Sequence, residues 1–139
     1  TAVKQLLASA DVVIVNGGNP DFGAFVLLHF VPEAFSPARE KIEAGAAVYI
    51  GESAGSMVAS SDFGLTSARL PLFDQLLRGD TAGMGLSGRC AIRPHDKGPA
   101  WDYVSALYGK QKDLRVVRLP DGEALRCVGK NCDVVGEKG

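Results

Sequence analysis

The 139-residue sequence is organised by short apolar runs that alternate with segments of helical periodicity. Residues 12–15 and 46–50 are predicted to be buried strands, and each run ends in a glycine-containing loop. Such alternation favours an α/β fold with a mainly parallel sheet flanked by helices, because parallel strands need crossover segments between them. Sites in these sheets collect at the carboxyl ends of strands, which here are the loops 16–19, 51–55 and 94–96.

The remaining pattern completes this architecture. Capping residues, prolines and glycines predict helices over residues 3–10, 20–30, 36–44, 70–78 and 101–108, the third starting at Ser36-Pro37 and the last stopped by Gly109. Further strands are predicted over residues 89–93, 114–119, 123–128 and 132–135. Turn signals around the last two predict a small C-terminal β-hairpin. The short apolar run at 46–50 suits an interior strand of the sheet.

Length and charge limit the function classes. A chain of this size fits a single domain over residues 1–139. Fifteen basic and 16 acidic residues leave a net charge of −1, so the expected partners are small substrates or proteins and not nucleic acid or membrane. Apolar runs are too short to span a bilayer, and no secretory signal pattern opens the chain.

Three cysteines, Cys90, Cys127 and Cys132, lack paired zinc-type spacing and have no histidine cluster beside them. We expect Cys127 and Cys132 to be buried thiols and not a redox pair. The pattern favours a reduced, cytoplasmic setting and predicts neither a metal nor a cofactor.

Gly51-Glu52-Ser53-Ala54-Gly55 matches the G-x-S-x-G pattern of a nucleophile elbow, directly between a predicted strand and a helix of small residues. A serine at the tip of this turn adopts strained backbone angles, and the flanking glycines avoid collisions with the strand and the helix. The alternative is a plain glycine-rich turn or a phosphate-binding loop. The context favours Ser53 as a nucleophile.

A serine hydroxyl needs a base, and the chain has only His29 and His95. His29 lies within an apolar helical segment, where a structural role is expected. His95 follows a strand, on a loop at the same predicted edge as Ser53, and is therefore the favoured base.

The base needs an acid, which the residues alone do not select. The candidates are Asp62, Asp74, Asp96, Asp121 and Glu123. Asp96 adjoins the histidine and would usually point elsewhere. Asp121 ends a strand that can neighbour that of His95, but it is as well explained as a turn residue in Pro-Asp-Gly.

The N-terminus of the helix after Ser53 directs free N–H groups at a nearby oxyanion, and the amide of Ala54 is the first donor. The Gly17-Gly18-Asn19 loop is either a turn or a backbone nest. If the two strands are neighbours, the Gly18 amide is the second donor. Asn19 is predicted both to cap the following helix and to contact substrate.

Four segments in this order resemble the dipeptidase E and cyanophycinase family of serine peptidases. They are Val-Asn-Gly-Gly-Asn at 15–19, Tyr-Ile-Gly-Glu-Ser-Ala-Gly-Ser at 49–56, Gly-Met-Gly-Leu at 83–86 with Arg-Pro-His at 93–95, and Leu-Pro-Asp-Gly-Glu-Ala-Leu at 119–125. The resemblance implies a fold related to flavodoxin-like proteins and class I glutamine amidotransferases.

This resemblance implies a serine dipeptidase with Ser53 as nucleophile, His95 as base and Asp121 as the acid. Family oxyanion donors fall on Gly18 and Ala54. A glutamine amidotransferase is disfavoured, because it would have cysteine at position 53 and glutamate at position 97, where this chain has Lys97. The residues from 96 to 109 contain no arginine to pair with a substrate aspartate, so an aspartyl dipeptide is expected by analogy alone.

The resemblance begins at an interior strand, so the N-terminal part of the family fold is expected to be missing. Either the chain is a fragment of the complete domain, or a homodimer copy or companion chain completes the sheet. Two other functions compete with a peptidase. One is a non-catalytic α/β binding or assembly module that keeps the elbow. The other is an esterase of α/β-hydrolase type, which would have its acid before its histidine.

Overall fold

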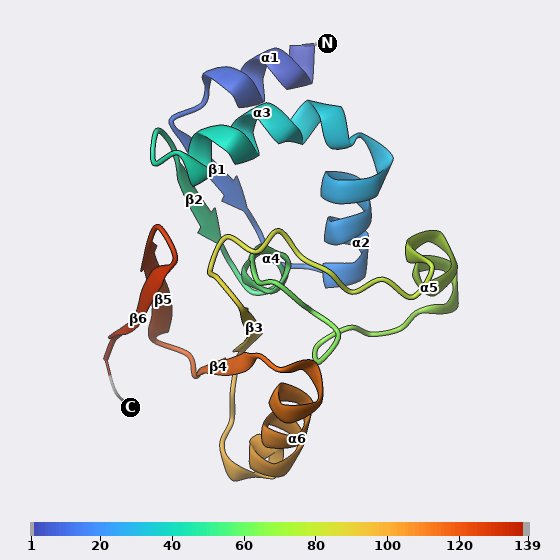
Figure 1. Cartoon of the computed structure of the whole chain (residues 1–139), viewed down its shortest axis with the longest axis vertical. Helices are drawn as coiled ribbons and strands as arrows, with labels where there is room; N and C mark the ends of the chain where they lie inside the picture. The colour runs from blue at the N-terminus through green and yellow to red at the C-terminus, as the bar shows by residue number, and fades with distance from the viewer. Residues whose placement is uncertain (1, 138–139) are drawn as a thin grey trace.

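The computed structural model describes residues 2–137 (Figure 1). The helices are α1 (Ala2–Ser9), α2 (Pro20–Ala24), α3 (Pro32–Glu43), α4 (Ala54–Ala59), α5 (Pro71–Leu77) and α6 (Asp102–Lys112), with a π-helical segment η1 (Phe25–Phe30) and a 3-10 turn η2 (Pro99–Trp101). The strands are β1 (Val12–Val15), β2 (Val48–Gly51), β3 (Cys90–Pro94), β4 (Arg115–Leu119), β5 (Glu123–Val128) and β6 (Asn131–Gly136). The predicted alternation of helices and strands is confirmed.

Strand pairing agrees with the predicted parallel arrangement, but the pairs do not join. β1 pairs with β2 and β3 with β4, both in parallel, while β5 and β6 form the predicted antiparallel hairpin. Within residues 2–137 these are three two-stranded sheets, so one continuous flavodoxin-like sheet is not seen. One reason lies at the start of β3, where the backbone N–H and hydroxyl of Ser61 both donate to the Cys90 carbonyl and occupy a position that a neighbouring strand would use.

The β1–β2 pair is covered on one face. Val13 is buried in the main core with residues of α3 and α4, and Tyr49 packs against the same core. The opposite face carries Val12, Ile14, Val48 and Ile50, which are between 49% and 62% exposed. The prediction that residues 46–50 form an interior strand is therefore wrong for this structure, because the described helices cover only one side.

Two helix boundaries differ from the prediction. α3 begins at Pro32 and contains Pro37, which lies just beyond the first turn and so removes a single helical hydrogen bond. α6 continues through Gly109 to Lys112. A Cβ atom at position 109 would lie 2.8 Å from the Leu114 carbonyl oxygen. Gly109 therefore permits the close approach of α6 to the following segment and does not end the helix.

The prediction of buried thiols at Cys127 and Cys132 is wrong. The two residues form a disulfide across the β5–β6 hairpin, where Cys127 is exposed and Cys132 half-buried. Directly paired positions of an antiparallel hairpin bring the two side chains together, which sequence spacing alone does not reveal. The expected cytoplasmic setting stays a prediction. Cys90 is a buried free thiol, and burial raises its pKa.

None of the helices within residues 2–137 has the length and apolar character needed to cross a membrane.

Candidate active site

Ser53 lies in the turn between β2 and α4, with φ of 50° and ψ of −110°. This is a backbone conformation that non-glycine residues rarely adopt. The two flanking glycines leave room for it. A Cβ atom at Gly51 would lie 2.6 Å from the Gly55 carbonyl, and one at Gly55 would lie 2.0 Å from the Val15 carbonyl oxygen. The predicted steric role of both glycines agrees with this close packing.

Tyr49 is hydrogen-bonded to the turn that contains Ser53. Its hydroxyl donates a hydrogen bond of 2.7 Å to the Gly55 carbonyl oxygen, and burial raises its pKa. The Ser56 hydroxyl donates to the Ser53 carbonyl oxygen at 2.6 Å. These bonds restrain the backbone between Ser53 and Gly55.

His95 contacts both Ser53 and Asp121. Its Nε2 lies 3.2 Å from Ser53 Oγ, and its Nδ1 lies 2.7 Å from Asp121 Oδ1. The contact with the acid follows from the β3–β4 ladder, in which Pro94 is opposite Leu119. His95 is one residue beyond that pair and Asp121 two residues beyond it, so both side chains lie at one edge, as predicted for the carboxyl ends of parallel strands.

The other candidates make different contacts. His29 lies in η1 and is exposed. Asp62 accepts hydrogen bonds from the Gly64 backbone N–H and the Tyr108 hydroxyl. Asp96 pairs with two arginines. Among the carboxylates of the described residues, only that of Asp121 lies within hydrogen-bond distance of the His95 imidazole.

The two predicted oxyanion donors are the amide of Gly18, in the loop after β1, and the amide of Ala54, directly after Ser53. A Cβ atom at Gly17 would lie 3.3 Å from Ser53 Cβ, which shows that the loop after β1 lies against the serine. In residues 2–137 the N–H groups of Gly18 and Ala54 donate no hydrogen bond to another group of the chain. Gly18 has φ of 142°, a conformation that favours glycine. The role of these two amides as oxyanion donors stays a prediction.

The predicted capping role of Asn19 is confirmed, because its Oδ1 accepts a hydrogen bond from the Phe22 N–H at 3.0 Å. The predicted contact of Asn19 with substrate stays a prediction.

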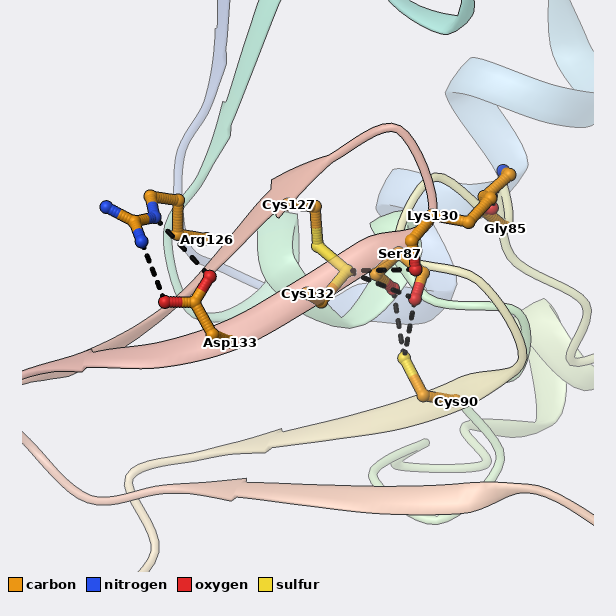
Figure 2. The surroundings of a disulfide bond; sticks show 8 residues. All are labelled: Gly85, Ser87, Cys90, Arg126, Cys127, Lys130, Cys132 and Asp133. Atoms are coloured by element: carbon orange, nitrogen blue, oxygen red, sulfur yellow. Dashed lines mark hydrogen bonds and ion pairs between the residues drawn. A yellow bond between two sulfur atoms is a disulfide. The ribbon is translucent and has the colours of Figure 1, made fainter.

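A cleft of about 1100 Å³ opens beside Ser53, His95 and Asp121. The turn of the β5–β6 hairpin forms one of its walls. Lys130 in this turn donates a hydrogen bond to the Gly85 carbonyl oxygen, and Figure 2 shows the disulfide next to Ser87 on the same loop. Cys132 Sγ lies 3.5 Å from the Ser87 carbonyl oxygen. The hairpin is therefore docked on loop 85–88 and closes this side of the cleft.

The described residues contain no group of three or more histidine, cysteine, aspartate or glutamate side chains placed to hold a metal ion.

Sequence reasoning did not assign roles to the side chains of Tyr49, Lys130, Arg93 and Arg118. Arg93 and Arg118 face each other in the ladder, in strands whose other core residues are apolar. Charged residues in such strands are the one signal that could have drawn attention to them.

Residues 1–135 match the family model described as Peptidase family S51. The chain belongs to peptidase family S51. The resemblance to dipeptidase E proteins is thereby confirmed at the level of the family. No curated protein sequence matches this S51 chain closely enough to count as a relative.

Among solved structures, the S51 chain is similar to a protein from Listeria monocytogenes EGD-e that carries the provisional name peptidase E. The TM-score is 0.71 and the identity 19%, with 99% of this chain covered. This likeness shows a common fold. The S51 chain spans 65% of the length of the Listeria chain.

Proposed function

We propose that this S51 chain hydrolyses an amide bond in a small peptide, with Ser53 as the nucleophile. The observation that carries the proposal is the hydrogen-bonded series from Ser53 Oγ to His95 Nε2 and from His95 Nδ1 to Asp121 Oδ1. A serine, a base and an orienting acid in this sequence of contacts are the components of acyl transfer.

In the first step, His95 takes the proton of Ser53 while Oγ attacks the carbonyl carbon of the peptide bond. The N–H groups of Gly18 and Ala54 donate to the oxyanion of the tetrahedral intermediate. His95 then gives the proton to the leaving amine, and an acyl-serine remains. A water molecule, deprotonated by His95, releases the acid product and regenerates Ser53.

Asp121 has two tasks in this scheme. Its carboxylate accepts a hydrogen bond from Nδ1–H, which leaves the Nε2 lone pair directed at Ser53. It also stabilises the positive imidazolium that forms during attack. This order along the chain, serine before histidine before acid, differs from the serine, acid, histidine order of α/β-hydrolase esterases and disfavours that alternative.

We propose an aspartyl dipeptide as the substrate class, by analogy with the family. Lys130 is the only lysine or arginine that lines the cleft within residues 2–137, and it is the side chain that we expect to attract a substrate carboxylate. Replacing Lys130 with glutamine should then raise KM for Asp-Leu more than for Asn-Leu.

The test of the function uses a fluorophosphonate probe and dipeptide hydrolysis in parallel. Only a serine activated by its base should react quickly with the probe. We expect Ser53→Ala to lose labelling and to lower kcat by roughly 10³ to 10⁶-fold. Ser9→Ala, which alters an exposed serine of α1, is the control and should retain both. If Ser53→Ala keeps wild-type turnover, the assignment is wrong. If the unaltered chain neither labels nor hydrolyses peptides, the non-catalytic module is favoured.

A further inference from the structure

Asp96, the residue after the proposed base His95, has a much less exposed side chain than His95 itself. The Asp96 side chain is 9% exposed, whereas the His95 and Asp121 side chains are 60% and 76% exposed. The Asp96 carboxylate accepts hydrogen bonds from Arg93 Nε at 3.3 Å and from Arg118 Nε and Nη2 at 3.0 and 3.2 Å. A largely buried carboxylate that accepts hydrogen bonds from two guanidinium groups has its position and orientation restrained.

The same contacts attach the loop after β3 to β4. The Asp96 N–H donates to the Leu119 carbonyl oxygen at 3.1 Å, and Arg118 Nη2 donates to the Gly98 carbonyl oxygen at 2.6 Å. Arg118 also pairs with Asp102 at the start of α6. The hydrogen bond to Asp102, and to a smaller extent the one to Asp96, raise the pKa of Arg118. Its guanidinium therefore stays charged at any pH at which the protein would be assayed.

The second arginine is also held. The guanidinium carbon of Arg93 lies 3.5 Å from the centre of the Trp101 ring, within the range of a cation–π contact. The carboxylate of Asp96 thus contacts two side chains whose own positions are restricted by other groups.

These attachments lie next to the proposed catalytic pair. His95 directly precedes Asp96, and Asp121 lies two residues after Leu119. The bond between Asp96 and Leu119 therefore fixes the separation of the two main-chain segments that carry the imidazole and its acid. His95 also has φ of 53°, a strained value that persists only where the surroundings impose it.

We propose that Asp96 is a positioning residue, which through Arg118 and β4 holds the His95 imidazole against Asp121. The kinetic part of this proposal rests on the proposed function, but the orientation of the ring does not. Loss of the Asp96 charge leaves the two arginines without their shared partner and loosens the loop that carries His95. The imidazole then leaves Asp121 for part of the time.

The first experiment determines the tautomer of the His95 imidazole by ¹⁵N NMR, at a pH where the ring is neutral. His29→Gln serves as the background for every variant, because His95 is then the only histidine. In the His29→Gln protein itself, we expect the His95 proton to be on Nδ1, facing Asp121, and the Nε2 lone pair to be free. In Asp96→Asn we expect a mixture of both tautomers.

A matched control is available in the same sheet. Asp113 pairs with Arg89 near the other end of the β3–β4 pair, and both side chains are largely exposed. Asp113→Asn removes a carboxylate of equal charge and should leave the His95 signals as they were. If Asp96→Asn also leaves them unchanged, the proposal is overturned. Should Asp96→Asn fail to fold, Arg118→Lys replaces it, since lysine keeps the charge but cannot contact both the carboxylate and Gly98 in the same geometry.

The second experiment measures dipeptide hydrolysis. We expect Asp96→Asn to lower kcat by about tenfold or more, with KM changed by less than about twofold, because misplacement of a base affects the chemical step and not binding. Asp96→Glu should recover part of kcat. Equal kcat for Asp96→Asn and the unaltered chain would contradict the proposal. If no variant hydrolyses peptides, the proposed function fails, and the NMR result still decides the role of Asp96.

Discussion

Ser53 Oγ lies 3.2 Å from His95 Nε2, although the two residues are 42 positions apart and follow strands of different two-stranded sheets. No ladder joins β2 to β3 in the described residues. The contact depends instead on α4, which has Ser53 as its N-cap and packs against β3, and on the hydrogen bonds from Ser61 to Cys90. The proposed nucleophile and base are therefore aligned by a helix and the loop that follows it.

The identity of the acid is tested by Asp121→Asn. An asparagine in this position can present its amide to His95 and favour the wrong tautomer, so we expect kcat to fall by about 10²- to 10⁴-fold. Glu123→Gln is the matched comparison, and its loss should be at least about tenfold smaller because, in the described structure, the His95 imidazole forms its carboxylate hydrogen bond with Asp121 and not with Glu123. Steady-state hydrolysis of one dipeptide by both variants measures the difference. A larger loss in Glu123→Gln would move the acid to that position.

Gly55→Ala tests the packing beneath the serine turn. The new methyl group would overlap the Val15 carbonyl oxygen, so we expect a loss of about 1–3 kcal/mol or more in the free energy of unfolding. Gly23→Ala is the control, since its Cβ would lie 3.7 Å from Val58 Cγ1, an ordinary contact, within α2. That variant should be neutral or more stable by up to about 1 kcal/mol. Urea denaturation of both variants measures the difference in stability. Equal midpoints would contradict the close approach of Gly55 to the Val15 carbonyl oxygen.

Tyr49 should make the stability of the protein fall in alkali. Burial raises its pKa in the folded state above the ordinary value of 10.0. Above about pH 10 the unfolded chain loses this proton while the folded chain keeps it, so the folded state binds more protons and stability decreases as pH rises. Below that pH the contribution is fully present. Each such tyrosine accounts for a slope of up to about 1.4 kcal/mol per pH unit.

Denaturation midpoints between pH 9 and 11 measure this slope. Tyr49→Phe should reduce it, at the cost of the hydrogen bond to Gly55. Tyr103→Phe is the comparison, because Tyr103 is 76% exposed. An unchanged slope in Tyr49→Phe would show that the hydroxyl is not buried in solution.

Reduction of the Cys127–Cys132 disulfide should loosen the wall of the cleft. The bond closes a loop with a sequence separation of five, for which chain entropy gives a stabilisation of about 2 kcal/mol. We expect Cys127→Ser with Cys132→Ser to accelerate amide hydrogen exchange in β5 and β6 and to raise KM, because the turn with Lys130 lines the cleft.

Exchange in β3 and β4 is the internal control for that experiment and should not change. Uniform acceleration over the whole chain would mean that the disulfide stabilises the fold globally and has no particular effect on the hairpin.

Local sequence signals determined much of this protein. The β-branched run at 12–15, the capping by Asn19 and the turn around Ser53 depend on neighbouring residues, and the structure has each of them where the pattern predicts. The set of candidates at the strand ends also followed from the sequence, because parallel strands that alternate with helices place their carboxyl ends on one side.

Tertiary structure alone decided the rest. Only long-range packing brought the Asp121 side chain within hydrogen-bond distance of His95, directed Asp96 to two arginines and paired Cys127 with Cys132, since each of these contacts depends on the register between strands. Long-range packing also explains why the β1–β2 and β3–β4 pairs are separate sheets and why α6 continues past Gly109. Register and close approach are set by how whole elements pack, and no window of neighbouring residues contains that information.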